Sequence, residues 1–245
     1  EAILNAGGEL HIVIPTIPSV FKAQSVAPYG DAWLDRFDSL WERASSVETI
    51  DSGKRLSHAA IMLAAQVAKG RAIDNAQRLE STHMPFEVSD GRPSRMPPST
   101  PALIVARSAT TDAGDDMPHG SCHFCIATDS PMASDAVHWE QVGDFYIRRG
   151  AQAADAIPSM KAVLFAAPDP RIAFDVTVSD DDAPHGVADN LNRLVRSASN
   201  GSAVATASAA MMIKALEPDL RLEPLGELPG SSGASGVYAI GPTSD

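Results

Sequence analysis

Residues 91–101 divide the chain, because four prolines fall within these eleven positions. Proline lacks a backbone N–H donor and fixes its φ angle, so this stretch cannot continue a helix or a central strand. The 245 residues are long enough for two domains that each bury a core. We therefore predict a domain at residues 1–91, a proline-rich linker at 92–101, a connecting α/β segment at 102–157 and a smaller domain at 158–245.

Strand-like and helix-like segments alternate before the linker. The β-branched or β-prone runs cover residues 10–15, 46–51 and 85–90. Asp31 can cap a helix, and apolar residues recur at helical spacing after it and over residues 59–79, which predicts two helices between these strands. This order predicts an α/β domain with a parallel sheet. Trp33 and Trp41 share one helical face, and we expect both to pack in its core.

A dense group of histidines and cysteines follows the linker. Cys122 and Cys125 lie within a β-prone run at residues 121–128, close to His119 and His123. Zinc takes four ligands, and two thiols three residues apart on a strand point to opposite faces. A redox Cys-x-x-Cys motif favours the start of a helix. Structural cysteines, a metal site and a redox site are therefore three interpretations of this group.

The remaining residues predict mixed α/β structure. Helices are expected at residues 134–149, 189–199 and 207–216, and strands at 160–167, 171–178, 203–206, 220–228 and 236–240.

Two landmarks in this part of the chain resemble class III nucleotide cyclases. Residues 161–167 are similar to the family's first strand, K-x-x-L-F-A-D, with Ala167 at the position of a magnesium-binding aspartate. Residues 191–196 are similar to V-N-x-A-A-R, and Asn192 and Arg196 keep its spacing. Arg171 begins a stretch that stands where the family has R-I-G-L/I-H.

The resemblance implies a reduced cyclase-like domain of the α+β, ferredoxin-like type. It implies that Asn192 and Arg196 bind a nucleotide and that the domain dimerises, because class III active sites form between two such domains. An Asn and an Arg on the polar face of an amphipathic helix are also common without any such role. Ala167 cannot bind a metal, and Gly143–Asp144, similar to the family's second metal site, precedes residues 161–167. We therefore assign no catalytic residue.

Residues 8–15, 25–38, 44–47 and 90–91 resemble a Rossmann-like domain found beside cyclase domains in bacterial multidomain proteins. Its first strand and the turn that follows would lie before Glu1, so we expect this domain to be truncated at its amino terminus. The chain contains no glycine-rich phosphate-binding motif.

The formal charge of −12 would repel nucleic acid, and no apolar run approaches the roughly 18 residues of a membrane span. We expect a cytoplasmic, non-catalytic cyclase-like pseudoenzyme that senses a nucleotide or second messenger, or that dimerises. One alternative is a cyclase that converts a purine nucleoside triphosphate to a cyclic nucleotide, with Mg²⁺ ligands supplied by a partner chain. The other is a metal- or redox-responsive regulator acting through Cys122 and Cys125.

Overall fold

The structure is a computed structural model that describes residues 2–50, 56–84, 120–129, 139–151, 170–179, 187–227 and 236–241. The chain divides into two compact units, one built mainly on residues 1–68 and the other mainly on residues 123–176 and 185–245. Among the described helices, none combines the length and apolar composition needed to cross a lipid bilayer.

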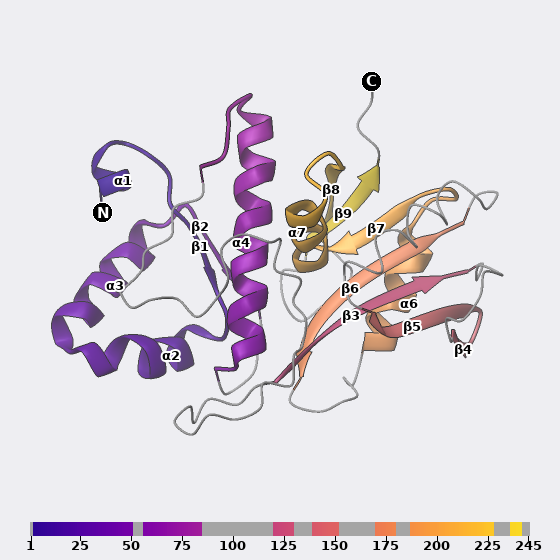
Figure 1. Cartoon of the computed structure of the whole chain (residues 1–245), viewed down its shortest axis with the longest axis horizontal. Helices are drawn as coiled ribbons and strands as arrows, with labels where there is room; N and C mark the ends of the chain where they lie inside the picture. The colour runs from indigo at the N-terminus through magenta and orange to yellow at the C-terminus, as the bar shows by residue number, and fades with distance from the viewer. Residues whose placement is uncertain are drawn as a thin grey trace. The chain divides into compact units, whose positions relative to one another are not determined.

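The amino-terminal unit contains a two-stranded parallel sheet (Figure 1). Strand β1 (His11–Ile14) pairs with β2 (Ser46–Thr49), which confirms the parallel pairing predicted for these segments. The elements outside the sheet are α1 (Ala2–Asn5), α2 (Pro18–Phe21), the π-helix η1 (Lys22–Val26), the 3₁₀-helix η2 (Ala27–Tyr29) and α3 (Asp31–Arg43). The third predicted strand, at residues 85–90, lies outside the described residues, so a Rossmann-like domain stays a prediction.

Helix α3 differs from the prediction in two ways. Its N-cap is Gly30, with φ of 97°, and no side chain caps the helix there. Trp33 is 53% exposed, so core packing is wrong for this residue. Trp41 instead stacks on Phe37, with ring centroids 5.5 Å apart. Two tryptophans on one helical face thus have different surroundings: Trp41 is half-buried beside Phe37, whereas Trp33 meets the exposed ring of Tyr29.

Helix α4 (His58–Arg78) confirms the long helix predicted at residues 59–79. The Ser57 hydroxyl accepts a hydrogen bond from the backbone N–H of Ala60 at 3.1 Å, as in an N-cap. The carboxyl-terminal half of α4 approaches helix α7 (Ala207–Leu216) closely: a Cβ atom built on Gly70 would lie 1.9 Å from the backbone oxygen of Met211. Gly70, in the middle of α4, therefore allows the backbones of α4 and α7 to come into contact.

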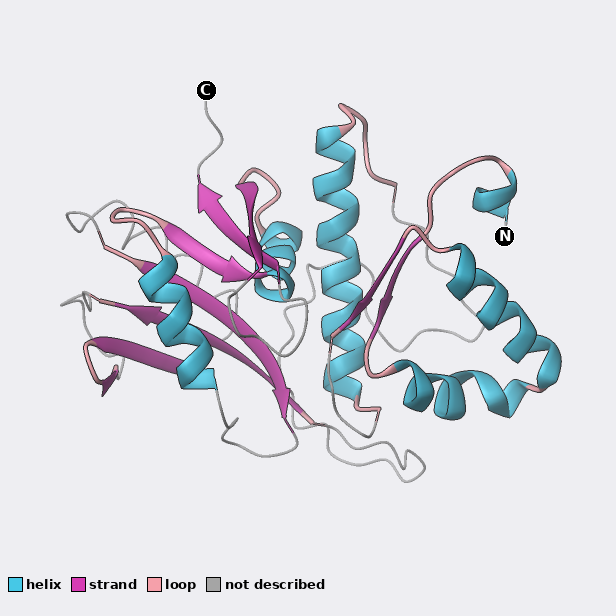
Figure 2. Ribbon diagram, turned by 180° about the vertical axis from the view of Figure 1, so that it is seen from behind, coloured by secondary structure: helices cyan, strands magenta, loops and turns pink. Residues whose placement is uncertain are grey.

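A seven-stranded sheet forms the centre of the carboxyl-terminal unit, in the order β4-β5-β3-β6-β7-β9-β8. Helices α6 (Val187–Ser197) and α7 (Ala207–Leu216) accompany it, and Figure 2 shows α6 lying along one face of the sheet. The strands are β3 (Ser121–Thr128), β4 (Glu140–Val142), β5 (Phe145–Ala151), β6 (Ile172–Ser179), β7 (Ala203–Thr206), β8 (Arg221–Glu227) and β9 (Gly236–Gly241).

The helix predicted at residues 134–149 is wrong for its described part, which forms the β4–β5 hairpin. Phe145 and Ile147 are buried, whereas the alternate residues Tyr146 and Arg148 are half-buried. This is the two-residue period of a strand. Gly143, with φ of 63°, provides the turn.

The core of this unit lies between α6 and the sheet. Leu191, Leu194 and Val195 of α6 pack in one cluster with buried residues of the strands, namely Cys125, Ala127, Phe145, Ile147, Ala173, Val204 and Val237. The strand β6 pairs in parallel with β7, with Ile172 opposite Ala203. The same packing leaves the polar face of α6 toward solvent.

Candidate functional site

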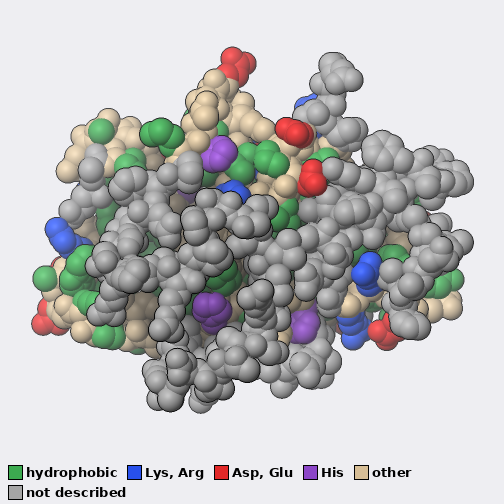
Figure 3. All heavy atoms as spheres, in the orientation of Figure 1, with side chains coloured by type: hydrophobic (Ala, Val, Ile, Leu, Met, Phe, Trp, Pro, Cys, Tyr) green, Lys and Arg blue, Asp and Glu red, His purple; other side chains and the backbone are tan. Residues whose placement is uncertain are grey.

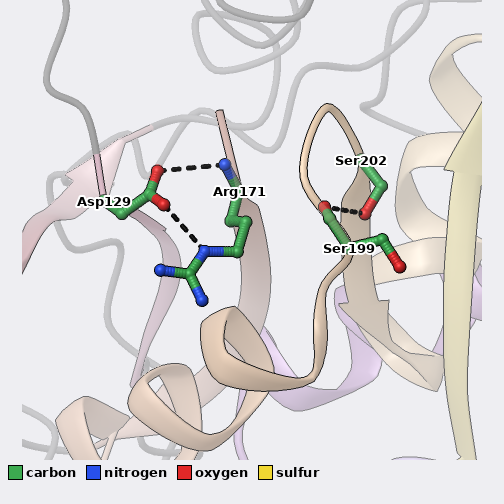
Figure 4. Close-up of polar contacts among 4 residues, drawn as sticks. All are labelled: Asp129, Arg171, Ser199 and Ser202. Carbon is green, nitrogen blue, oxygen red and sulfur yellow. Dashed lines mark hydrogen bonds and ion pairs between the residues drawn. The ribbon is translucent and has the colours of Figure 1, made fainter. Parts of the chain in front are cut away.

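The best-defined polar contact near the sheet joins Asp129 to Arg171 (Figure 4). Asp129 directly follows β3, and Arg171 directly precedes the neighbouring strand β6. One carboxylate oxygen accepts the Arg171 backbone N–H at 3.0 Å, and the other accepts Nε–H at 2.7 Å. The Asp129 side chain is 22% exposed. Both oxygens of this carboxylate are therefore engaged in a partly shielded, charge-assisted pair.

A second acid, Asp144, lies at the tip of the β4–β5 hairpin and is exposed. Strand β5 runs antiparallel to β3, with Tyr146 opposite Thr128. Because Asp129 follows Thr128 and Asp144 precedes Phe145, the two acids lie at the same end of the β3–β5 ladder. Along the sequence, the β4–β5 hairpin therefore comes after β3 and before Arg171. Residues 161–167, including Ala167, lie outside the described residues.

Asn192 and Arg196 both belong to α6 and contact each other. The Nε–H of Arg196 donates to the Asn192 side-chain oxygen at 2.8 Å. Arg196 is exposed and Asn192 is half-buried, on the helix whose opposite face holds Leu191. The four-residue spacing therefore brings these two side chains together, as expected on a helix. Their role in nucleotide binding stays a prediction.

Asp175 is buried in β6, with 4% of the residue exposed. One carboxylate oxygen accepts both the Val176 backbone N–H and the Thr206 hydroxyl, each at 2.9 Å. Burial raises the pKa of this carboxyl from 3.8 to about 6, although hydrogen bonds from Thr206, Val176 and Asn190 oppose the shift. From the sequence, Asp175 could in principle replace the missing metal ligand, although nothing in its spacing requires that role. An aspartate within an apolar strand is nevertheless a visible signal.

The cysteines have different surroundings on β3. Cys125 is fully buried in the core cluster, whereas Cys122 is half-buried, and neither belongs to a disulfide bond. The side-chain Nε2 of His123 is buried and has no hydrogen-bond partner among the described residues. His119 lies outside the described residues. In the part of the chain that the structure describes, no three His, Cys, Asp or Glu side chains are grouped to hold a metal ion.

On the face drawn in Figure 3, the described Lys and Arg side chains are scattered among apolar and acidic groups. This distribution agrees with the acidic composition of the chain.

No protein-family model and no curated protein matches the chain, but solved structures do. One is the guanylate cyclase domain of RhGC from Catenaria anguillulae in complex with GTP, at 15% identity and TM-score 0.37, covering 50% of this chain and 97% of that one. Another is the adenylate/guanylate cyclase/hydrolase from Silicibacter pomeroyi, at 13% identity and TM-score 0.38, covering 51% and 99%. A third is the adenylyl cyclase CyaB from P. aeruginosa, at 11% identity and TM-score 0.36, covering 51% and 96%.

Proposed function

We propose that the carboxyl-terminal unit is a cyclase-like domain that binds a nucleotide without cyclising it. The observation that carries this proposal is the bidentate pairing of the Asp129 carboxylate with Arg171. Asp129 directly follows β3, and the Gly-Asp hairpin and then Arg171 come after it along the chain. In class III cyclases the Gly-Asp hairpin lies between the strand with the first metal-binding aspartate and the R-I-G-x-H strand, so we place the first metal-ligand position at Asp129 instead of Ala167. The acid in the position of the first metal ligand is therefore neutralised by an arginine.

This pairing opposes metal-dependent catalysis. Cyclisation needs divalent ions because their charge offsets the negative charge that develops on the phosphate. A metal ion at Asp129 would have to replace two charge-assisted hydrogen bonds and would then lie beside the Arg171 guanidinium. The positive charge already present disfavours a divalent cation in the same place.

The nucleotide-binding part of the proposal rests on Asn192 and Arg196. A guanidinium presents several donors in a planar fork that matches a phosphate group, and an amide can bond to a ribose or phosphate oxygen. The contact between Arg196 and Asn192 uses Nε, so it orients the guanidinium on the exposed face of α6. We also propose a second copy of this chain as the partner, because the resemblance implies a site shared between two domains.

We expect Arg196→Ala to weaken nucleotide binding about tenfold or more, because a charge-assisted contact to phosphate contributes roughly 1.5 to 3 kcal/mol. The measurement is calorimetric titration of the full chain with ATP and GTP, with and without Mg²⁺. Arg193→Ala is the matched control, because it removes the same charge from an exposed position on the same helix. Equal affinity in the two variants would contradict the assignment of Arg196.

A second candidate function is catalysis by this chain itself, favoured by the common position of Asp129 and Asp144 at one end of the β3–β5 ladder. The test is cyclic nucleotide formation by the purified chain in Mg²⁺ or Mn²⁺. Product that disappears in Asp144→Asn would establish catalysis and overturn the non-catalytic proposal. Nucleotide binding without product would support that proposal.

A further inference from the structure

A hollow of about 500 Å³ lies in the amino-terminal unit, between the η1–η2 segment and α3. Its apolar lining consists of Val26, Tyr29, Trp33, Phe37 and Leu40. The volume is within the range of small-molecule sites, which run from about 300 to 1,000 Å³.

Local backbone geometry creates this hollow. The π-helix η1 supplies Val26, and π-helical turns are rare and frequently occur at functional sites. Gly30 has a φ of 97° between η2 and α3, a conformation that glycine adopts without strain. From there α3 presents Trp33, Phe37 and Leu40 at spacings of four and three, which places them on one helical face. The hollow is thus built from three consecutive elements of one unit.

Two of the three aromatic side chains that line this hollow are exposed. Trp33 is 53% exposed and Tyr29 is 72% exposed. Their rings meet edge to face, with centroids 6.5 Å apart. A flat apolar molecule that covers these rings removes them from water. Binding then gains about 25 cal/mol of free energy for each Å² of apolar surface that is buried.

The lining also contains a positive charge, supplied by Arg36. Its guanidinium carbon lies 5.4 Å from the centroid of the Trp33 ring, a cation–π distance. Among the described residues that line the hollow, Arg36 is the one charged residue and none is acidic. A ligand with a negative group would therefore find a complementary charge at an aromatic wall.

We propose that this hollow is a binding site for a small, planar aromatic molecule that carries one anionic group. The aromatic walls hold the ring system, and Arg36 pairs with the anion. The proposal is independent of the cyclase-like domain, because every lining residue lies within residues 25–40.

The probe that tests this chemistry is 1-anilinonaphthalene-8-sulfonate, with N-phenyl-1-naphthylamine as its uncharged analogue. We expect one molecule of 1-anilinonaphthalene-8-sulfonate to bind per 245-residue chain in a calorimetric titration and to quench tryptophan fluorescence. Arg36→Gln is expected to weaken sulfonate binding about tenfold and to change binding of the uncharged analogue less than twofold. Arg43→Gln, which removes the same charge from α3 outside the hollow, is expected to leave both affinities unchanged.

Trp33→Leu tests the aromatic wall and is expected to weaken both probes about fivefold or more. The change should leave cooperative unfolding intact, because Trp33 is largely exposed. If the leucine variant does not fold, the Arg36→Gln and Arg43→Gln pair decides the question alone. Binding of many sulfonates per chain, or equal binding by the wild type and Arg36→Gln, would overturn the proposal.

Discussion

Gly70→Ala is expected to destabilise the carboxyl-terminal unit by about 3 kcal/mol, the upper part of the usual range for overpacking a core. The added Cβ atom would lie 1.9 Å from the backbone oxygen of Met211, 2.6 Å from its carbonyl carbon and 2.9 Å from its Cα. All three are backbone atoms of a fully buried residue in α7, so no side chain can rotate to make room. The two helices would have to separate.

The sign of this effect makes it a sharp test. Alanine is a better helix former than glycine by about 1 kcal/mol, so the same substitution at an open helical position stabilises. Ala72→Gly is the matched control, because Ala72 is exposed on the same helix, and we expect it to cost about 1 kcal/mol. Urea unfolding of both variants measures the two changes. A Gly70→Ala variant as stable as the wild type would contradict the close contact of α4 with α7.

Other contacts of α4 in this unit support the same packing. The Arg71 guanidinium donates to the Tyr238 hydroxyl of β9 at 2.8 Å, and its carbon lies 5.8 Å from the centroid of that ring. One turn and a half later, the Gln77 side-chain amide donates to the Pro218 carbonyl at 2.9 Å. Gly70 is thus one of several points at which this half of the helix is held.

Local sequence signals predicted much of the secondary structure. The strand at residues 203–206 and the helix at 207–216 were predicted with the bounds that the structure has, since most residues of both are buried and apolar. At residues 134–149 a helix was predicted where the structure has the short β4–β5 hairpin, which carries few apolar residues. Gly143 marks its turn, and the alternation of Phe145 and Ile147 was the stronger signal there.

The site was only partly predictable, because its contacts differ in range. Asn192 and Arg196 meet through helical spacing, which a sequence shows directly. Asp129 and Arg171 are 42 residues apart, and their contact depends on β3 being the neighbour of β6. Helical periodicity likewise placed Trp33 on an apolar face but could not show whether another element covers that face.

Asp175→Asn is expected to stabilise the protein at neutral and alkaline pH by about 1 to 3 kcal/mol. Burial raises the pKa of this carboxyl to about 6, so its ionised form is disfavoured in the folded state. A difference of about two pKa units between folded and unfolded chains corresponds to roughly 3 kcal/mol. Asparagine keeps an oxygen that can accept the Val176 and Thr206 hydrogen bonds, which limits the loss of these contacts.

The pH dependence of this gain identifies its cause. Near pH 3 and below, Asp175 is protonated in both the folded and the unfolded chain, so burial of this acid costs little free energy and the two proteins should be about equally stable. As the pH rises through the window from 3.8 to about 6, the unfolded chain releases its proton first, and the wild type loses stability that the variant keeps. Urea unfolding at pH 4, 5, 6 and 8 should therefore show a growing difference that levels off above pH 6. Asp144→Asn, at an exposed hairpin tip, is the control expected to show no such growth. A variant less stable than the wild type at every pH would mean instead that the hydrogen bonds to an ionised Asp175 outweigh the cost of burying its charge.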